Sequence, residues 1–228
     1  MNKPIFITAI DTDAGKTYAT GLLAKYLQDQ GCNVITQKLS QTGCKDTSED
    51  IEMHRKLMGI PMQEADRSGL TCPYIFDYPA SPELSASLEG KVIDPMTIKQ
   101  ATDQLTEQYE QVIIEGVGGL YVPLNAETTV LDYLQAQDYP TVLVSSAKLG
   151  SINHSLMSLE IAKQRGLNIR GIIYNRIADH TELIAEDTRR VLLKYLKQFG
   201  FPEVLIEIPK VDENGAIPAI DFSPLIQS

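Results

Sequence analysis

Short runs of apolar, often β-branched residues alternate along this chain with longer segments in which apolar residues recur at helical spacing. The short runs predict strands at residues 5–10, 33–38, 111–115, 141–146, 169–175 and 204–209. The longer segments predict helices at about residues 16–30, 51–58, 97–109, 152–164 and 181–199. Strands that alternate with helices are typical of the α/β class, so we expect a mostly parallel central sheet with helices on both faces.

The first and last helices each have an apolar stripe, and a middle region follows neither period. The first helix groups its apolar residues on one face and ends at Gly31, a suitable C-cap. The last predicted stripe consists of Ile184, Val191, Leu192, Tyr195 and Phe199. Residues 72–95 are rich in Pro, Ser and aromatic side chains, which predicts an irregular or partly helical excursion that forms a wall near the site.

Composition narrows the function classes. The 228 residues suit one domain, 1–228, and 43% of them are apolar. A net charge of −10 without a basic run argues against a nucleic-acid surface. Three cysteines without a C-x-x-C pair argue against a disulfide framework, and no run approaches the ~20 apolar residues of a membrane span. Residues 4–10 are too short a run for a secretory signal, so we expect a cytoplasmic protein without a membrane partner.

The stretch AIDTDAGKT, residues 9–17, lies between the first strand and the first helix. It matches the phosphate-binding template G-x-x-x-x-G-K-[ST], except that Ala9 replaces the first glycine. Alanine is tolerated where the backbone is extended, as expected at a strand end. Lys16 is then expected to reach the β- and γ-phosphates, and the Thr17 hydroxyl to bind Mg²⁺. The fold expected is therefore that of a P-loop NTPase-like, Rossmann-like three-layer domain.

Two acidic residues are candidate metal ligands. Glu115 ends the strand QVIIE beside a glycine-rich turn, where a Walker-B-type carboxylate holds Mg²⁺; the alternative is a solvated Glu before an ordinary turn. Asp50 begins the predicted second helix, where an acid that only stabilises the helix dipole is nearly as good an explanation. Glu49 and Glu52 nearby leave the choice of residue open.

Two more segments follow strands and therefore lie at the ligand-binding edge of such a sheet. Lys38 ends the second strand, and it either meets an anionic ligand or extends to the surface. In KLGSINH, residues 148–154, free backbone N–H groups at Ser151, Ile152 and Asn153 would bind a carboxylate, although Ser151 could equally be a simple N-cap. His154 is a weak candidate for a base.

The residues at and after the end of the predicted strand 169–175 indicate which nucleotide base the site binds. The guanine-reading sequence N-K-x-D is missing, because YNRIAD has Ala178 at the fourth position. The Asn175 side chain can still recognise a purine amino group, so adenine is the expected base.

Taken together, the motifs resemble the dethiobiotin synthetase family over nearly the whole length. The resemblance rests on DTDAGKT, KLSQTG, PYIFDYPASPELSA, EGVGGLYVPL, KLGSINH and the closing EIP. The chain departs from the family at Ala9 and at Leu39, where the family typically has glycine and proline.

The resemblance implies ATP- and Mg²⁺-dependent ring closure of 7,8-diaminononanoate with CO₂. Lys16 and Lys38 would be catalytic, and the metal ligands would be Thr17, Asp50 and Glu115. It implies that ATP contacts Asp13, Ala14, Gly15, Lys16, Thr17, Tyr18, Glu115, Gly118, Asn175, Pro209, Val211 and Glu213. The other substrates would contact Thr12, Lys38, Thr42, Gly118, Gly150, Ser151, Ile152 and Asn153. The family works as a homodimer, and residues 150–153 of the partner subunit would complete the substrate site.

Two rival functions remain. Partitioning and regulatory ATPases resemble K-G-G-x-G-K-T, with a lysine early in the loop, where this chain has IDTDA. A cobyrinate-type amidation enzyme would be expected to carry a glutaminase domain as well.

Overall fold

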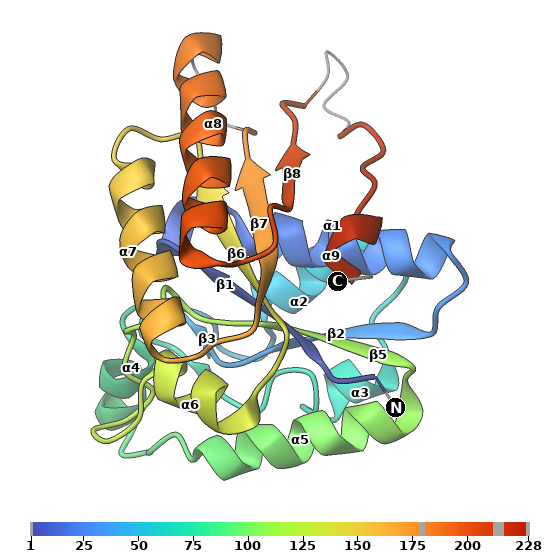
Figure 1. The fold of residues 1–228 in the computed structure, drawn as a ribbon. Helices are drawn as coiled ribbons and strands as arrows, with labels where there is room; N and C mark the ends of the chain where they lie inside the picture. Colours follow the sequence, from blue (N-terminus) through green and yellow to red (C-terminus); the bar gives the residue numbers. More distant parts are fainter. Residues whose placement is uncertain (1, 178–180, 212–216, 227–228) are drawn as a thin grey trace.

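A computed structural model describes residues 2–177, 181–211 and 217–226, and within them a parallel sheet forms the centre of the molecule (Figure 1). Its order is β2-β5-β1-β6-β7-β8, and every neighbouring pair is parallel. The strands are β1 (Ile5–Ala9), β2 (Val34–Lys38), β5 (Gln111–Glu115), β6 (Thr141–Ser146), β7 (Ile169–Asn175) and β8 (Leu205–Ile208). The predicted parallel sheet is confirmed.

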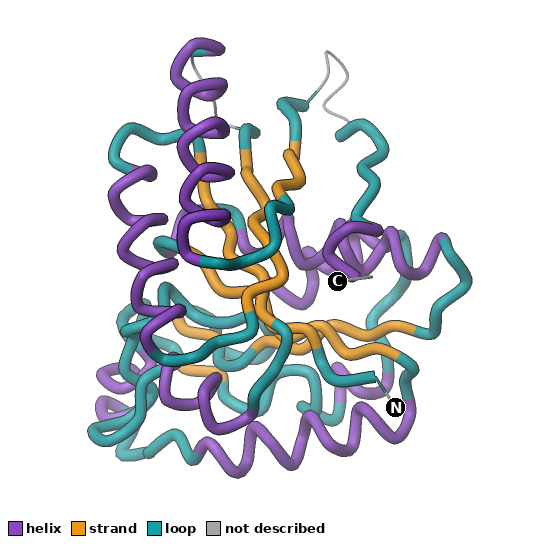
Figure 2. Tube along the Cα trace, in the orientation of Figure 1, coloured by secondary structure: helices purple, strands orange, loops and turns teal. Residues whose placement is uncertain are grey.

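Helices cover both faces of this sheet, as predicted. One face packs against α1 (Lys16–Asp29), α2 (Glu49–Met58) and α9 (Ser223–Ile226). The other packs against α5 (Pro95–Gln108), α6 (Val130–Gln137), α7 (Ser151–Gln164) and α8 (Glu182–Phe199), with the strands between the two layers (Figure 2). The strand period explains the two cores, because Ile5 and Ile7 of β1 join one and Phe6 joins the other.

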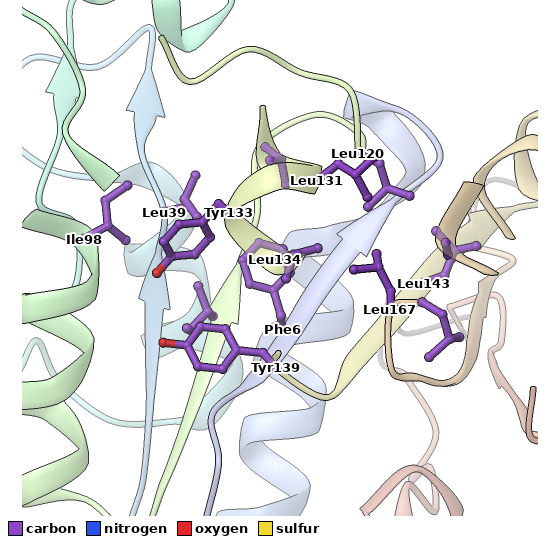
Figure 3. Packing of buried hydrophobic residues seen from close by; sticks show 14 of the residues in the cluster. Phe6, Leu39, Ile98, Leu120, Leu131, Tyr133, Leu134, Tyr139, Leu143 and Leu167 are labelled. Carbon is purple, nitrogen blue, oxygen red and sulfur yellow. The ribbon is translucent and has the colours of Figure 1, made fainter. Parts of the chain in front are cut away.

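The core under α5 and α6 is built around aromatic side chains (Figure 3). The ring centroids of Phe6 and Tyr133 lie 6.5 Å apart, and those of Tyr133 and Tyr139 lie 6.3 Å apart in an edge-on arrangement. These spacings are favourable for aromatic pairs, and the rings anchor α6 on β1.

The structure corrects the prediction for the face of α8. Its buried residues are Ala185, Thr188, Leu192 and Leu196. Ile184, expected on the buried stripe, has 41% of its surface exposed. The small side chains of Ala185 and Thr188 face the core instead, next to the packed helix α7.

Several short elements had no counterpart in the sequence pattern. They are α3 (Glu64–Arg67), α6, and a two-stranded sheet of β3 (Gln41–Thr42) and β4 (Ile75–Phe76). Within residues 72–95, α4 (Pro82–Leu88) gives the partly helical excursion that was expected. No helix in the described ranges has the length and apolarity needed to cross a bilayer.

Strand order brings the ends of the central strands together. Strands β2 and β5 lie on one side of β1, and the later strands β6, β7 and β8 lie on the other side. The strand order therefore reverses at β1. Ligands in such sheets bind at this switch point, beyond the carboxyl ends of the strands. The loop after β1 and the ends of β2 and β5 meet there.

Candidate active site

The phosphate-loop motif forms a compact turn between β1 and α1. A 3₁₀ turn η1 (Thr12–Ala14) follows Asp11, whose carboxylate accepts the Thr12 N–H at 2.7 Å. Ala9 is the last residue of β1, fully buried and paired with Val144 of β6. The expectation that Ala9 occupies extended backbone is confirmed, and this backbone conformation does not require glycine.

Lys16 is 4% exposed, and its side chain lies along the inside of the loop. Its Nζ donates to the carbonyl oxygens of Asp11 at 3.0 Å and Thr12 at 3.3 Å. Burial, followed by the neighbouring charge of Lys38, lowers the pKa of Lys16 to about 8. The positive charge of this buried ammonium is only partly balanced by nearby carboxylates, so Lys16 is suited to a site that receives phosphate.

Gly15 and Asn175 lie in close contact. Gly15 has φ 99°, and a Cβ there would lie 2.0 Å from Asn175 Nδ2. The Asn175 amide donates to Ala14 O at 3.0 Å and accepts the Ile177 N–H at 3.0 Å. The candidate base-recognising residue therefore also fixes the phosphate loop.

Thr17 lies between the two candidate metal carboxylates. Its Oγ1 lies 2.8 Å from Asp50 Oδ1 and 3.2 Å from Glu115 Oε1. Glu115 is 1% exposed, which excludes a solvated role, and Asp50 is half-buried whereas Glu49 and Glu52 are exposed. Of the acids at the start of α2, the structure thus brings Asp50 to the site.

Lys38 binds both carboxylates. Its Nζ lies 2.6 Å from Asp50 Oδ2 and 2.8 Å from Glu115 Oε1, and it donates to Gly116 O at 3.1 Å. It is 4% exposed, so it does not extend to the surface. Burial opposes its charge, but the two carboxylates outweigh burial and raise the pKa of Lys38. Burial alone would raise the pKa of Glu115, but Lys38 and His54 lower it to about 2, so Glu115 is ionised.

Leu39, at the second departure from the family pattern, is fully buried. Its N–H donates to Glu115 O at 2.9 Å. Proline has no N–H, so it could not make this bond between the end of β2 and Glu115.

His54 is a site residue that the sequence did not reveal. It is fully buried, and its Nε2 lies 2.7 Å from Glu115 Oε2. His54 follows Asp50 by four residues on α2, so both side chains lie on the same helix face. That spacing is a usable signal once Asp50 is chosen, but the chain contains no metal-binding histidine pattern to draw attention to it.

These residues enclose a cavity of about 480 Å³. It is lined by Thr12, Asp13, Lys16, Thr17, Lys38, Gln41, Thr42, Asp50, Ala80, Ser81, Pro82, Glu115, Val117, Gly118 and Val122. Residues 80–82 come from the excursion predicted to form a wall near the site, and that prediction is confirmed. Gln41 was not expected here, although it is adjacent to Thr42.

The start of α7 differs from expectation. Gly150 caps this helix with φ 95°, but the Ser151 N–H donates to Lys148 O at 3.0 Å. The prediction that the Ser151 N–H is free is therefore wrong, because the chain makes a turn before the helix begins. The Ser151 hydroxyl points inward, 2.9 Å from Ser146 Oγ. In the part of the chain that the structure describes, none of residues 150–153 lines the cavity.

The adenosine candidates lie beside the end of β7. Asn175 pairs in register with Ile208, and Pro209 and Val211 follow directly, with Val211 42% exposed. Tyr18 lies half-buried in the first turn of α1, next to Thr17. Glu213 lies outside the described residues.

The oxygen atoms of Thr17, Asp50 and Glu115 suit Mg²⁺, which is usually held by one or two carboxylates together with substrate phosphates. No cluster of three or more His, Cys, Asp or Glu side chains with metal-binding geometry occurs within the described ranges. A dedicated all-protein metal cage is therefore not part of the described structure, and the donor set fits a metal that arrives with phosphate.

The fold and the loop define a P-loop nucleotide-binding protein. A family model described as "AAA domain" matches residues 3–216. Among solved structures, the cell division protein FtsY of Thermotoga maritima superposes with a TM-score of 0.53 at 17% identity, covering 100% of this chain and 68% of that one. The septum site-determining protein MinD of Pyrococcus horikoshii, solved with Mg-ADP, gives 0.53 at 18% identity over 92% and 82%. At these identities the likeness concerns the fold alone.

Curated relatives identify the family. The chain is 48% identical to ATP-dependent dethiobiotin synthetase BioD 2 of Pasteurella multocida, over 91% of this chain and 97% of that protein. It is 51% identical to ATP-dependent dethiobiotin synthetase BioD of Chlorobaculum tepidum, over 91% and 85%. The chain belongs to the ATP-dependent dethiobiotin synthetase family.

Proposed function

We propose that this protein catalyses the ATP- and Mg²⁺-dependent carboxylation and ring closure of 7,8-diaminononanoate to dethiobiotin. The observation that carries the proposal is the convergence of Lys16, Lys38, Thr17, Asp50 and Glu115 on one cavity. Relatives that are 48–51% identical and bear the name of this enzyme support it.

The reaction begins when one substrate amine adds to CO₂ and loses a proton, giving a carbamate. A carbamate oxygen attacks the γ-phosphorus of ATP, ADP leaves, and a carbamic–phosphoric anhydride forms. The second amine attacks the anhydride carbonyl, expels phosphate and closes the ureido ring. Every intermediate is anionic, so fixed positive charge and positioning account for most of the catalysis.

Different residues of the cavity would bind different groups of the reactants. Lys16 would bind the β- and γ-phosphates from the loop, and Lys38 would stabilise the carbamate and the γ-phosphate from the end of β2. Thr12 and Thr42, which line the same cavity, would orient the carbamate and the diamine through their hydroxyl groups.

Thr17, Asp50 and Glu115 would hold Mg²⁺. When bound, this ion neutralises phosphate charge during the transfer. In the free protein Lys38 pairs with the same two carboxylates, with contacts of 2.6 and 2.8 Å, and balances one of their two negative charges. Lys38 also lines the cavity, so its ammonium would face the substrate beside the residues that would hold the metal.

The nucleotide contacts follow the loop and the end of β7. Asp13 to Tyr18 would surround the phosphates, with Gly118 opposite. Asn175 would recognise adenine, since its amide retains one N–H and one oxygen lone pair beyond its bonds to Ala14 and Ile177. Pro209 and Val211 would border the adenosine, and a ribose contact from Glu213 remains part of the proposal.

We also propose a homodimer in which residues 150–153 of one subunit complete the other's substrate site. Exposed apolar side chains support an interface around α7, with Leu149 94% exposed, Met157 62% and Tyr121 61%. Met157 and Tyr121 line a second hollow of about 670 Å³ together with His154. Analytical ultracentrifugation tests the dimer: Leu149→Glu should give monomers with reduced activity, whereas a monomeric wild type would refute it.

The activity is tested with ATP, Mg²⁺, labelled bicarbonate and 7,8-diaminononanoate. We expect phosphate release only when the diamine is present, with label in an acid-stable product. Lys16→Ala should abolish both, and full activity of that variant would disprove the assigned loop. Hydrolysis of ATP at the same rate without the diamine would refute the proposal and favour a nucleotide-dependent switch of the partitioning type.

A further inference from the structure

His54 is a buried residue that is hydrogen-bonded to Glu115 of the candidate site. It is fully buried on α2, with Nε2 2.7 Å from Glu115 Oε2 and Nδ1 3.0 Å from Thr36 Oγ1. Thr36 lies on β2, two residues before Lys38 and so on the same face of the sheet. Helix α2 and strands β2 and β5 thus contribute one residue each to a buried chain of hydrogen bonds.

Which groups donate and which accept in this chain of hydrogen bonds is set by the groups at its two ends. Arg55 Nη1 donates to Thr36 Oγ1 at 2.7 Å, and a guanidinium can only donate. Asp66 holds Arg55 by two bonds, from Nη2 at 2.7 Å and from Nε at 2.9 Å. The Thr36 hydroxyl can then donate its own hydrogen to Nδ1 of His54. At the other end the Glu115 carboxylate only accepts, so His54 donates to it from Nε2.

This bond distinguishes the two oxygens of Glu115. Oε2 accepts from His54, on the buried side. Oε1 lies 2.8 Å from Lys38 Nζ and 3.2 Å from Thr17 Oγ1, on the cavity side. A carboxylate can rotate about its last bond, and a donor fixed in a packed helix prevents that rotation.

We propose that His54 is a positioning residue for Glu115: by donating from Nε2 to Oε2, it presents Oε1 to the metal-binding side of the cavity. The inference rests on the proposed function, because it takes Glu115 as a metal ligand. His54 itself does not line the cavity. Its partners Thr36, Arg55 and Asp66 maintain the orientation of its ring.

Two amide substitutions separate positioning from packing. His54→Gln can place an amide N–H near the position of Nε2, whereas His54→Asn, equally polar, places its amide near Nδ1 and leaves Oε2 without a donor. The probe is Mn²⁺, and its affinity for the protein bound to a non-hydrolysable ATP analogue is measured by EPR. The affinity for the metal-free analogue and the thermal midpoint are measured alongside.

We expect His54→Asn to bind Mn²⁺ about 10–100-fold more weakly than the wild type, with the metal-free analogue bound equally well. His54→Gln should recover about tenfold of that loss. Leu196→Ala is the packing control, since Leu196 is fully buried on α8, which carries no residue of this chain of hydrogen bonds. It should lower the thermal midpoint and leave Mn²⁺ affinity unchanged.

Several results would overturn the inference. These are equal Mn²⁺ affinities for the wild type and both His54 variants, or a loss in both variants that follows the thermal midpoint as closely as in Leu196→Ala. In either case a wild type that still closes the ring would show that only the positioning role fails. A wild type that binds no Mn²⁺ beside the nucleotide and turns over no diamine would refute the proposed function and this inference together.

Discussion

Lys38 and Glu115 end two neighbouring strands in register, and their charged groups lie 2.8 Å apart with almost no exposure to solvent. Asp50 completes the arrangement at 2.6 Å from the Lys38 ammonium. The site therefore holds an ion cluster of one ammonium and two carboxylates before any ligand binds, and each part of it depends on the others.

Replacing Lys38 by Met should destabilise the protein strongly. The change leaves Glu115 and Asp50 close together without the ammonium, and removing one partner of a buried ion pair typically costs about 3–5 kcal/mol. Urea denaturation at pH 7 measures the loss. Adding Glu115→Gln to the same chain should recover part of it, and a loss below about 1 kcal/mol in the single variant would contradict the reading of a coupled buried cluster.

ATP binding should take up a proton above pH 8. Burial and the charge of Lys38 lower the pKa of free Lys16 to about 8, and bound phosphates would raise it again. At a pH between the pKa of Lys16 in the free protein and its pKa in the complex, Lys16 is deprotonated in the free protein and protonated in the complex. The affinity for ATP therefore falls as pH rises, by up to about tenfold per pH unit. Calorimetry at pH 8.5 in buffers of different ionisation enthalpy detects the uptake. Lys16→Met should remove it, and uptake that persists in this variant would assign the proton elsewhere.

Gly15→Ala should disrupt nucleotide binding for two separable reasons. The residue has φ 99°, and the new Cβ would lie 2.0 Å from Asn175 Nδ2. Gly31→Ala is the matched control, because Gly31 has φ 84° with no atom within 4 Å of the Cβ position. Positive φ alone costs roughly 1–2 kcal/mol of stability. We expect both variants to lose stability and only Gly15→Ala to lose ATP affinity, about tenfold or more, since it displaces Asn175. Equal affinities in the two would show that the contact is unimportant.

Ala9→Gly, which restores the usual motif, should not improve the enzyme. Ala9 is buried in extended backbone and has no need of glycine's freedom. The change removes a packed methyl group and adds chain entropy, so stability should fall by about 1 kcal/mol with ATP affinity unchanged. Urea denaturation and an ATP titration of the wild type and Ala9→Gly test this prediction. A several-fold higher ATP affinity in Ala9→Gly would mean that alanine strains the loop.

Much of the architecture followed from local pattern. The strands at 111–115, 141–146 and 169–175 were predicted with the bounds observed, because each is a short apolar run between clear turn signals. The phosphate loop was equally local, since one contiguous segment contains its turn, Lys16 and Thr17. The α8 stripe was misjudged because small residues such as Ala185 carry a weak apolar signal.

The sequence by itself determined the α/β class, the phosphate loop and the identity of Lys38, Asp50 and Glu115 as candidates. Only the tertiary structure decided that Lys38 pairs with both carboxylates, that Glu115 is ionised in the interior and that His54 supports it. The physical reason is strand order: β5 lies beside β2, so residues 77 positions apart in the chain become hydrogen-bonded neighbours. Charge and protonation in such a cluster depend on burial and on partners from other elements, which no local pattern contains.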